Sequence, residues 1–400
     1  MQSFRLKVLD SFHCLGGQCT FNCCQGWKIA LDTTTAAKWE ALEPTKLKQS
    51  LLAAVDKKIE DSGEKLSLCM DAKGRCVLLD ETGLCSVHKH SENLLPSICR
   101  DYPRTNCNYG SRSLVTANLS CPEIVRLVLT TDTKDQFQIT EGGPSEAVFF
   151  LEGNEQVSLQ IESFVKQAMA EQRFPLATRI TGIAEILVHL AVKSQQSGAR
   201  GLGMTEVQRL CAKPKQRIYE IREKSKLKQL KPAPSAAGRF WKFIASMLDT
   251  KQAQIYLGPE LTQSLLVQQA VAAKTEAECE AFYREVMSYR DKAAFELTET
   301  YQPYGEKYLS VKFVNSGFPN APTAGNYIAT FLYCIFPYAL VQFIFWLLAA
   351  QKGKIADLDV INIITRVDRL LSHNNHVYSY LDQNPGALRL DLYYPCLLEL

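Results

Sequence analysis

Residues 12–27 read FHCLGGQCTFNCCQGW and place four cysteines within a short span of chain. Glycines and short polar residues allow a loop here to fold back, so that several sulfurs face one centre. Cys23 and Cys24 are adjacent, and neighbouring side chains of a regular strand point to opposite faces. We therefore expect a turn, the start of a helix or two separate centres at this point.

Further cysteines follow in three short stretches. Cys76 and Cys85 enclose an apolar run, an acidic turn and Gly83, which predicts a tight hairpin or loop that returns one cysteine beside the other. Residues 95–104, LPSICRDYPR, and residues 119–123, LSCPE, carry one cysteine each. The cysteine-bearing stretches therefore extend over the first 125 residues.

Cysteine usage separates the first third of the chain from the rest. The chain has 14 cysteines, and most of them lie at or before Cys121. Residues 1–10 show no long apolar segment and no small-residue cleavage site, so no secretory signal is visible. Clustered cysteines in a cytoplasmic protein favour a soft-metal site, whereas disulfides in an oxidising compartment are the alternative. We predict metal binding and a cytoplasmic location.

Composition excludes several classes of protein. Of the 400 residues, 46% are hydrophobic and 22% are charged, which argues against disorder, collagen and coiled coil. The net charge of +3 is too small for a protein that coats nucleic acid. A length of 400 residues favours two or three domains.

Beyond the cysteines, apolar residues recur at helical spacing. Residues 130–144 are polar and end in Gly-Gly-Pro, which predicts a linker. Residues 157–168, 180–190 and 361–371 each carry an apolar stripe typical of a buried helix face. The predicted fold is mainly α: a cysteine-rich metal-binding segment, residues 1–130, packed on a larger helical domain, residues 131–400.

The most apolar stretch is YIATFLYCIFPYALVQFIFWLLAA, residues 327–350, which carries no charge. Length alone would allow it to cross a membrane. Pro337 and Gln342 interrupt it, however, and its aromatic residues are spread throughout. We therefore predict a buried helix pair inside the helical domain and favour no membrane span.

Residues 213–231 form the most basic stretch, with a local charge of +6. A solvated helix face is one interpretation, and a docking patch for an acidic protein partner is the other. Tyr219 is the single aromatic residue in this stretch, so nucleic acid is not predicted as a partner.

The order and spacing of eight cysteines resemble those of the flagellin lysine-N-methylases. The N-terminal part is also similar to the zinc- or iron-chelating cysteine-cluster proteins. This resemblance implies a bacterial enzyme that methylates the ε-amines of flagellin lysines, using S-adenosylmethionine and a cysteine-bound iron–sulfur cluster, [4Fe–4S]. Cys69 and Cys107 lie outside the pattern. The metal ligands that the resemblance implies are Cys14, Cys19, Cys23, Cys24, Cys76, Cys85, Cys99 and Cys121.

Two features leave the chemistry open. Eight cysteines exceed the four that one cubane cluster needs, so either two centres exist or half of them pack or react as thiols. A zinc ion accepts the same four-cysteine ligand set and is the alternative metal. A non-enzymatic iron- or zinc-binding protein, or a helical interaction protein with a structural zinc module, are therefore the competing functions.

The mechanism predicted from the residues is a polar methyl transfer. Radical S-adenosylmethionine enzymes carry Cys-x3-Cys-x2-Cys, and Gly26 stands where the third cysteine would follow Cys19 and Cys23. A neutral lysine amine displaces a methyl group from a sulfonium directly, so the enzyme has to remove a proton whose usual pKa is about 10.4. A carboxylate or tyrosine base would serve. No strand-linked Gly-x-Gly-x-x-Gly occurs, which argues against a Rossmann-type methyltransferase domain.

Overall fold

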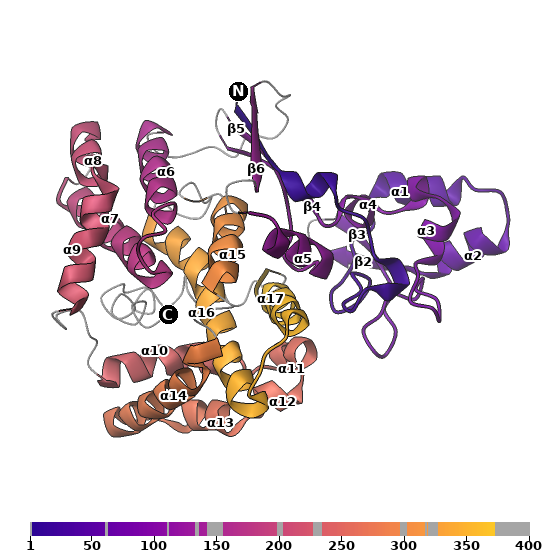
Figure 1. Ribbon diagram of the computed structural model, residues 1–400. Helices are drawn as coiled ribbons and strands as arrows, with labels where there is room; N and C mark the ends of the chain where they lie inside the picture. The colour runs from indigo at the N-terminus through magenta and orange to yellow at the C-terminus, as the bar shows by residue number, and fades with distance from the viewer. Residues whose placement is uncertain are drawn as a thin grey trace.

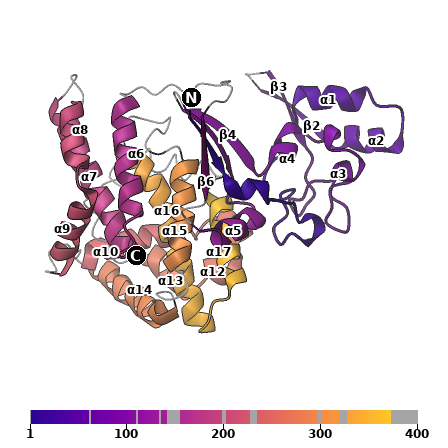
Figure 2. The ribbon, with the colours of Figure 1, turned by 45° about the horizontal axis from the view of Figure 1, so that its top comes forward.

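The computed structural model divides the chain into two bodies joined by a small sheet. A cysteine lobe, residues 13–102, lies to the right in Figure 1, and a helical body, residues 122–372, lies to the left and below. The sheet stands between them in both ribbon views (Figures 1 and 2). The structure describes residues 2–60, 63–109, 112–132, 136–141, 155–197, 203–226, 234–296, 302–316, 318 and 327–372.

The central sheet is formed by distant parts of the chain. Its strand order is β4-β5-β1-β6, with β1 parallel to β5 and antiparallel to β6, and β4 antiparallel to β5. The first and last parts of the cysteine-rich segment therefore meet in one sheet. The strands are β1 (Gln2–Leu6), β4 (Arg104–Tyr109), β5 (Arg112–Ala117) and β6 (Phe137–Glu141).

Strand β6 corrects the prediction of a linker over residues 130–144. Phe137 pairs with Leu6, and Ile139 pairs with Phe4, in the antiparallel register of β1 and β6. Phe137 and Ile139 alternate with polar neighbours, which is the period-two pattern of a half-buried strand. This short pattern was outweighed by the polar composition around it. The strand also lies beyond residue 130, where the sequence placed the end of the first segment.

The cysteine lobe has a small core of its own. Trp39 is fully buried at its centre, and its indole N–H donates to the carbonyl of Leu94 at 2.8 Å. Asp32 caps α1 by accepting the backbone N–H of Thr35. Its elements are α1 (Thr33–Glu40), α2 (Lys46–Ala53), β2 (Val55–Glu60), β3 (Gly63–Leu68), α3 (Ser86–His90) and α4 (Ser97–Asp101), with short 3-10 helices at Gly16–Gln18 and Glu92–Leu94.

The helical body confirms the mainly α fold class, and its core includes the predicted apolar stripes. Val157, Ile180 and Ile364 are all buried in this core. The core also takes in Leu6 from β1, and a 3-10 helix, Lys7–Asp10, leads into it. The first and last parts of the cysteine-rich segment thus pack into the helical body. Its helices are α5 (Pro122–Thr130), α6 (Glu155–Met169), α7 (Leu176–Ser197), α8 (Met204–Cys211), α9 (Pro214–Lys226), α10 (Pro234–Ser246), α11 (Lys251–Leu257), α12 (Pro259–Thr262), α13 (Leu265–Ala272), α14 (Glu276–Glu296), α15 (Gln302–Asn315), α16 (Tyr327–Lys352) and α17 (Asp357–Ser372).

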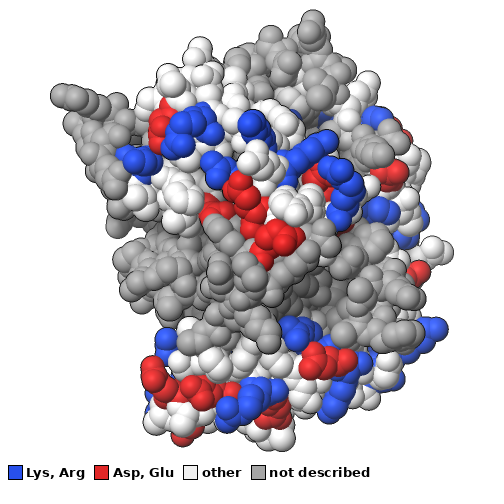
Figure 3. Space-filling view, turned by 60° about the vertical axis from the view of Figure 1, so that its left-hand side comes forward, with Lys and Arg blue, Asp and Glu red and all other residues white. Residues whose placement is uncertain are grey.

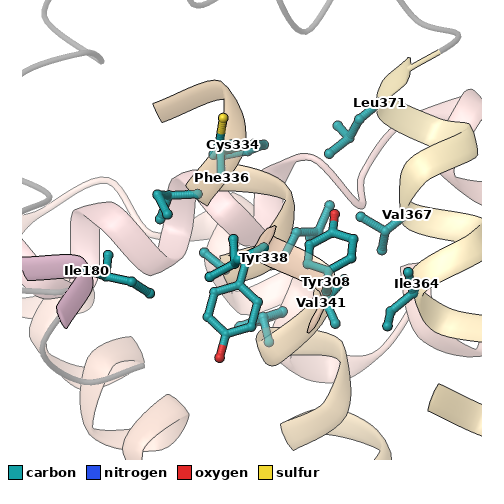
Figure 4. Packing of buried hydrophobic residues seen from close by; sticks show 14 of the residues in the cluster. Ile180, Tyr308, Cys334, Phe336, Tyr338, Val341, Ile364, Val367 and Leu371 are labelled. Carbon is teal, nitrogen blue, oxygen red and sulfur yellow. The ribbon is translucent and has the colours of Figure 1, made fainter. Parts of the chain in front are cut away.

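Helix α16 forms the axis of this body. The sequence predicts a buried helix pair, but residues 327–352 form one continuous helix with Pro337 inside it. A proline inside a helix costs one backbone hydrogen bond, which burial of the surrounding side chains offsets. By length and composition the helix is apolar enough to cross a membrane, yet its most apolar stretch is entirely buried inside the protein. Figure 4 shows Phe336, Tyr338 and Val341 of this helix among side chains of its neighbours.

Close contact between α10 and α14 depends on Gly238. A Cβ added there would overlap the backbone carbonyl of Cys279 on α14. Gly238→Ala is therefore expected to lower the free energy of unfolding by about 1–3 kcal/mol, although alanine is the better helix former. Urea denaturation measures the change. In the control Gly203→Ala, the added Cβ meets no atom within 4 Å. Equal stability of the two variants would contradict the expected overlap.

Candidate metal centre

Three cysteines form the middle of the sulfur cluster in the cysteine lobe. The side chain of Cys24 is hydrogen-bonded to the thiols of both Cys23 and Cys85. The backbone N–H of Cys76 donates to the carbonyl of Cys24 at 2.8 Å, which ties the first cysteine stretch to the second. Leu79 and Cys85 pair in an antiparallel bridge, so the chain between Cys76 and Cys85 turns back as the sequence predicts.

These hydrogen bonds separate the three thiols in acidity. The bond from Cys24 lowers the pKa of Cys85 to about 6 and also lowers the pKa of Cys23. The same contacts raise the pKa of Cys24, because its single S–H proton is held between the sulfurs of Cys23 and Cys85. Thiolate rather than thiol is the form that binds a metal. The arrangement therefore prepares Cys23 and Cys85 as sulfur donors.

Two more thiols complete an inner thiol group. Burial raises the pKa of Cys76 and of Cys99, and negative charge on Cys85 and Cys23 raises both further, so all four lie within electrostatic reach of one another. Cys69, which lies outside the resemblance, is a further neighbour of Cys76. We define the inner thiol group as Cys23, Cys24, Cys76, Cys85 and Cys99.

An outer thiol group lies on the other side of Cys23. Burial raises the pKa of Cys19, and charge on Cys23 and Cys14 raises it further. Burial likewise raises the pKa of Cys121 to about 12, with Cys19 and Cys23 as charged neighbours. Cys14 is exposed, and its sulfur accepts the N–H of Gly16 at 3.4 Å. The outer thiol group is therefore Cys14, Cys19 and Cys121.

Two candidate ligands stand at helix starts. Cys85 is the N-cap of α3, and the backbone N–H groups of His88 and Val87 lie near enough to its thiol to lower its pKa. Cys121 is the N-cap of α5, and the backbone N–H groups of Ile124 and Glu123 lower the pKa of its thiol against the larger effect of burial. The first N–H groups of a helix have no partner inside the helix, so they stabilise a thiolate at that position. Hydrogen bonds to the sulfurs are also what tunes a cysteine-bound metal.

The donor chemistry of these residues fits a soft metal. The eight candidate sulfurs come from four stretches of chain and are neighbours of one another within the inner and outer thiol groups, and thiolates select zinc and iron–sulfur clusters. All twelve cysteines whose side chains the structure describes are free thiols. In the described part of the chain, no three His, Cys, Asp or Glu side chains already have the geometry that holds a metal ion. Cys107 and Cys396 fall outside the described side chains.

Arg369 of α17 reaches the cysteine loop from the helical body. Its guanidinium donates to the carbonyls of Phe21 at 2.6 Å, Asn22 at 3.3 Å and Ser120 at 3.0 Å. It also lies 4.9 Å from the ring of Trp27, and the residue is only 3% exposed. Phe21 and Asn22 come just before the candidate ligand Cys23 in the chain, and Ser120 comes just before the candidate ligand Cys121. Arg369 therefore fixes both loops to α17.

Charge on Arg369 acts on the sulfurs that it faces. It lowers the pKa of Cys19 and of Cys23 against the opposing effect of burial. Sequence analysis missed this residue, because Arg369 lies among apolar positions of a helix with no cysteine nearby in the chain. The available signal was two arginines three residues apart, Arg366 and Arg369, inside a strongly apolar helix pattern.

A second contact joins the loop to the helical body. The hydroxyl of Tyr256 on α11 donates to the carbonyl of Gly26 at 2.6 Å. Gly26 has φ +93°, and a Cβ there would approach the Tyr256 ring to 3.0 Å. Gly26 stands where a radical S-adenosylmethionine enzyme would carry its third cysteine. Both the positive φ of the turn and the close approach of Tyr256 require a glycine at this position.

Within the basic stretch at residues 213–231, residues 214–226 form α9, and residues 227–231 lie outside the described part of the chain. Lys213 and Lys215 are exposed, and Lys215 lies 3.5 Å from Glu171. Figure 3, which brings this side of the molecule forward, shows lysines and arginines interspersed with acidic residues. Mixed charges are typical of a solvated face.

Comparison with known families places these residues in context. The model of the FliB lysine N-methylase C-terminal domain matches residues 163–386, which is more than half of the chain. This chain belongs to the FliB lysine N-methylase family. A second family model, described as "Putative zinc- or iron-chelating domain", matches residues 13–122. In this family member, α17 with Arg369 lies within the first match, and the eight candidate ligands lie within the second.

Curated relatives agree with this assignment. The lysine-N-methylases of Salmonella typhimurium and Salmonella choleraesuis are each 35% identical over 123 residues, which is 30% of this chain and 30% of each relative. The flagellar biosynthetic protein FliU of Salmonella muenchen is 34% identical over 123 residues, which is 71% of that protein. The match thus spans less than a third of the length of the two lysine-N-methylases. No solved structure matches this chain.

Proposed function

We propose that this protein methylates the ε-amines of flagellin lysines, with S-adenosylmethionine as the methyl donor. The observation that carries the proposal is the FliB lysine N-methylase match over residues 163–386, in a body whose helix α17 binds the cysteine loop through Arg369. The names of the curated relatives, lysine-N-methylase and flagellar biosynthetic protein, support lysine and flagellin as the targets. The free cysteines are in keeping with the reducing cytoplasm, which we propose as the location.

A [4Fe–4S] cluster is the metal centre that we propose for the cysteine lobe. Its ligands would come from the inner thiol group, whose five sulfurs are one more than a cubane requires. Bound there, the cluster would orient the donor or stabilise the loop around Gly26 and Trp27. The chain itself prepares the site through the thiol hydrogen bonds of Cys24 and the N–H groups at the start of α3.

Methyl transfer on this proposal is polar. The lysine ammonium loses one proton to a base, and the neutral nitrogen attacks the methyl carbon. The carbon–sulfur bond of the sulfonium breaks, which leaves a neutral thioether and places the positive charge on the methylated nitrogen. Gly26 supports this route over a radical one, because the structure uses that position for a turn of positive φ against Tyr256.

Metal content is expected to depend on the inner thiol group. Protein purified without oxygen is expected to carry about four iron and four acid-labile sulfide per chain and to absorb broadly near 400 nm. Cys85→Ser is expected to lose most of this iron, because it removes a sulfur whose thiolate form the hydrogen bond from Cys24 favours. Elemental analysis and the visible spectrum measure both effects.

Cys14→Ser is the matched control for this prediction, since Cys14 is exposed at the edge of the outer thiol group. It is expected to retain the iron. Zinc without sulfide in the wild-type protein would contradict the cluster and favour the structural zinc module. Equal iron in both variants would exclude Cys85 as a ligand.

Co-expression with flagellin tests the activity directly. Flagellin is expected to gain mass in whole methyl-for-hydrogen steps with the wild-type chain and to gain none without it. Unmodified flagellin beside a fully metal-loaded chain would favour the alternative of a non-enzymatic iron- or zinc-binding protein.

A further inference from the structure

A groove of about 750 Å³ lies where the cysteine lobe meets the helical body. Trp27 and Met70 line it from the cysteine lobe, and Ile255 of α11 lines it from the helical body. Most of the lining residues belong to the cysteine lobe, and Ile255 adds a contribution from the helical body. Ligand sites are common at such domain boundaries.

Apolar surface in the groove is left uncovered. Ile255 is 68% exposed, although it is a large aliphatic residue beside a well-packed core. The ring of Trp27 lines the groove and also contacts the guanidinium of Arg369. A ligand that packs on Trp27 would therefore contact a residue that itself contacts Arg369, the arginine bound to the cysteine loop.

The lining of the groove carries more positive than negative side chains. Lys28, Lys58 and Lys73 line it, against the single carboxylate of Asp56. The ammonium of Lys28 lies 3.8 Å from the carboxylate of Asp56, so Asp56 already forms an ion pair with one of the three lysines. Within the described part of the chain, the ammonium groups of Lys58 and Lys73 have no carboxylate within 4 Å, and both side chains are exposed. Apolar side chains combined with charged groups at one surface are typical of a protein-binding site.

We propose that this groove binds an acidic segment of the protein substrate, with an apolar side chain on Trp27 and carboxylates paired with Lys58 and Lys73. The identity of that substrate as flagellin rests on the proposed function. Charge complementarity selects the occupant, because the exposed ammonium groups of Lys58 and Lys73 repel a basic segment and attract an acidic one. Nucleic acid is disfavoured, since no arginine is among the described residues that line the groove and the whole chain carries a net charge of only +3.

Charge reversal in the groove tests this inference. Unmethylated flagellin is immobilised, and its Kd for the full-length protein is measured at about 0.05 M and about 0.5 M salt. The double variant Lys58→Glu, Lys73→Glu is expected to raise Kd by about tenfold at low salt and by much less at high salt. The KM for flagellin is expected to rise with Kd, with unchanged iron content and unchanged circular dichroism.

Two further variants make the comparison specific. Lys46→Glu with Lys354→Glu makes the same change of net charge at exposed positions away from the groove, and it is expected to leave Kd within about twofold of the wild-type value. Lys213→Glu with Lys215→Glu tests the competing basic surface on α9. The inference is overturned when the α9 variant alone weakens binding, or when all three variants bind equally.

The binding test of the groove and the methylation test of the proposed function can fail independently of each other. Flagellin that binds through Lys58 and Lys73 but gains no methyl groups would support the groove and refute the methyltransferase. Flagellin that is methylated with an unchanged KM in the groove variant would refute the groove and leave the methyltransferase intact.

Discussion

Arg369→Gln is expected to lower the free energy of unfolding by about 3 kcal/mol and to reduce the metal content of the protein severalfold. Three carbonyls, from Phe21, Asn22 and Ser120, would lose a charged donor in a buried setting. Hydrogen bonds to charged groups are worth about 1.5–3 kcal/mol each, and relief of the buried charge offsets part of their loss. The loop that carries Cys19 and Cys23 would then be free to move away from Cys76, Cys85 and Cys99.

The neighbouring arginine supplies the control. Arg366 lies 4.7 Å from the ring of Phe21, donates to the carbonyl of Leu257 at 3.2 Å and makes no hydrogen bond to the cysteine loop among the described contacts. Arg366→Gln is therefore expected to retain its metal. Arg369→Lys should lie between the wild type and Arg369→Gln, because one ammonium group cannot replace the planar guanidinium at three carbonyls.

Metal analysis and denaturation together distinguish positioning from simple stability. Iron content, its rate of release to a chelator and the unfolding midpoint are measured on each variant. An Arg369→Gln protein that binds iron as tightly as the wild type would show that the helical body does not organise the cysteine loop.

Asp368→Asn is expected to destabilise the helical body by about 3–5 kcal/mol. Lys312 of α15 and Asp368 of α17 form an ion pair of 2.5 Å, and their side chains are 7% and 3% exposed. Removal of the carboxylate leaves a buried ammonium without its compensating charge, which costs more than the pair itself contributes. Urea denaturation followed by circular dichroism measures the loss.

Two comparisons test this explanation. The double variant Lys312→Met, Asp368→Leu removes both charges and is expected to recover most of the lost stability. Removing the exposed pair of Glu206 and Arg209, 2.8 Å apart, is expected to change stability by less than about 1 kcal/mol. A double variant as unstable as Asp368→Asn would show that packing, rather than an uncompensated charge, explains the loss.

Adjacent residues of α17 thus have separate tasks. Asp368 fixes the helix inside the body, and Arg369 extends from it to the cysteine loop. A helix that is loosened at Asp368 also moves the guanidinium, so Asp368→Asn is expected to lose some metal as well. The loss of metal relative to the loss of stability is expected to be larger in Arg369→Gln than in Asp368→Asn.

Much of the fold was predictable from local patterns. The apolar stripes of α6, α7 and α17 lie in the core, because a helical period of 3.6 residues places them on one face whatever the neighbours are. The turn before Cys85 was predictable too. Asp80 accepts the N–H groups of Thr82 and Leu84 there, and Gly83 has φ +77°. These are short-range preferences of the residues themselves.

Other elements depended on distant partners. Residues 137–141 became β6 because β1, more than 130 residues earlier in the chain, offered an edge with matching Phe4 and Leu6. Pro337 was predicted to divide the apolar stretch, but the helices packed around α16 keep it continuous. In both cases burial against remote residues outweighed a local preference, which is a tertiary effect.

By itself the sequence determined which residues have the chemistry of this protein: eight cysteines in a fixed order, a helical remainder and the resemblance to lysine methylases. Tertiary structure decided which thiols are hydrogen-bonded to one another and that α17 binds the cysteine loop. It also decided where the groove lies between the cysteine lobe and the helical body. Spacing along a chain specifies residue types and local turns. The pairing of Arg369 with the carbonyl of Phe21 joins residues 348 positions apart, and such a contact follows only from the folded arrangement.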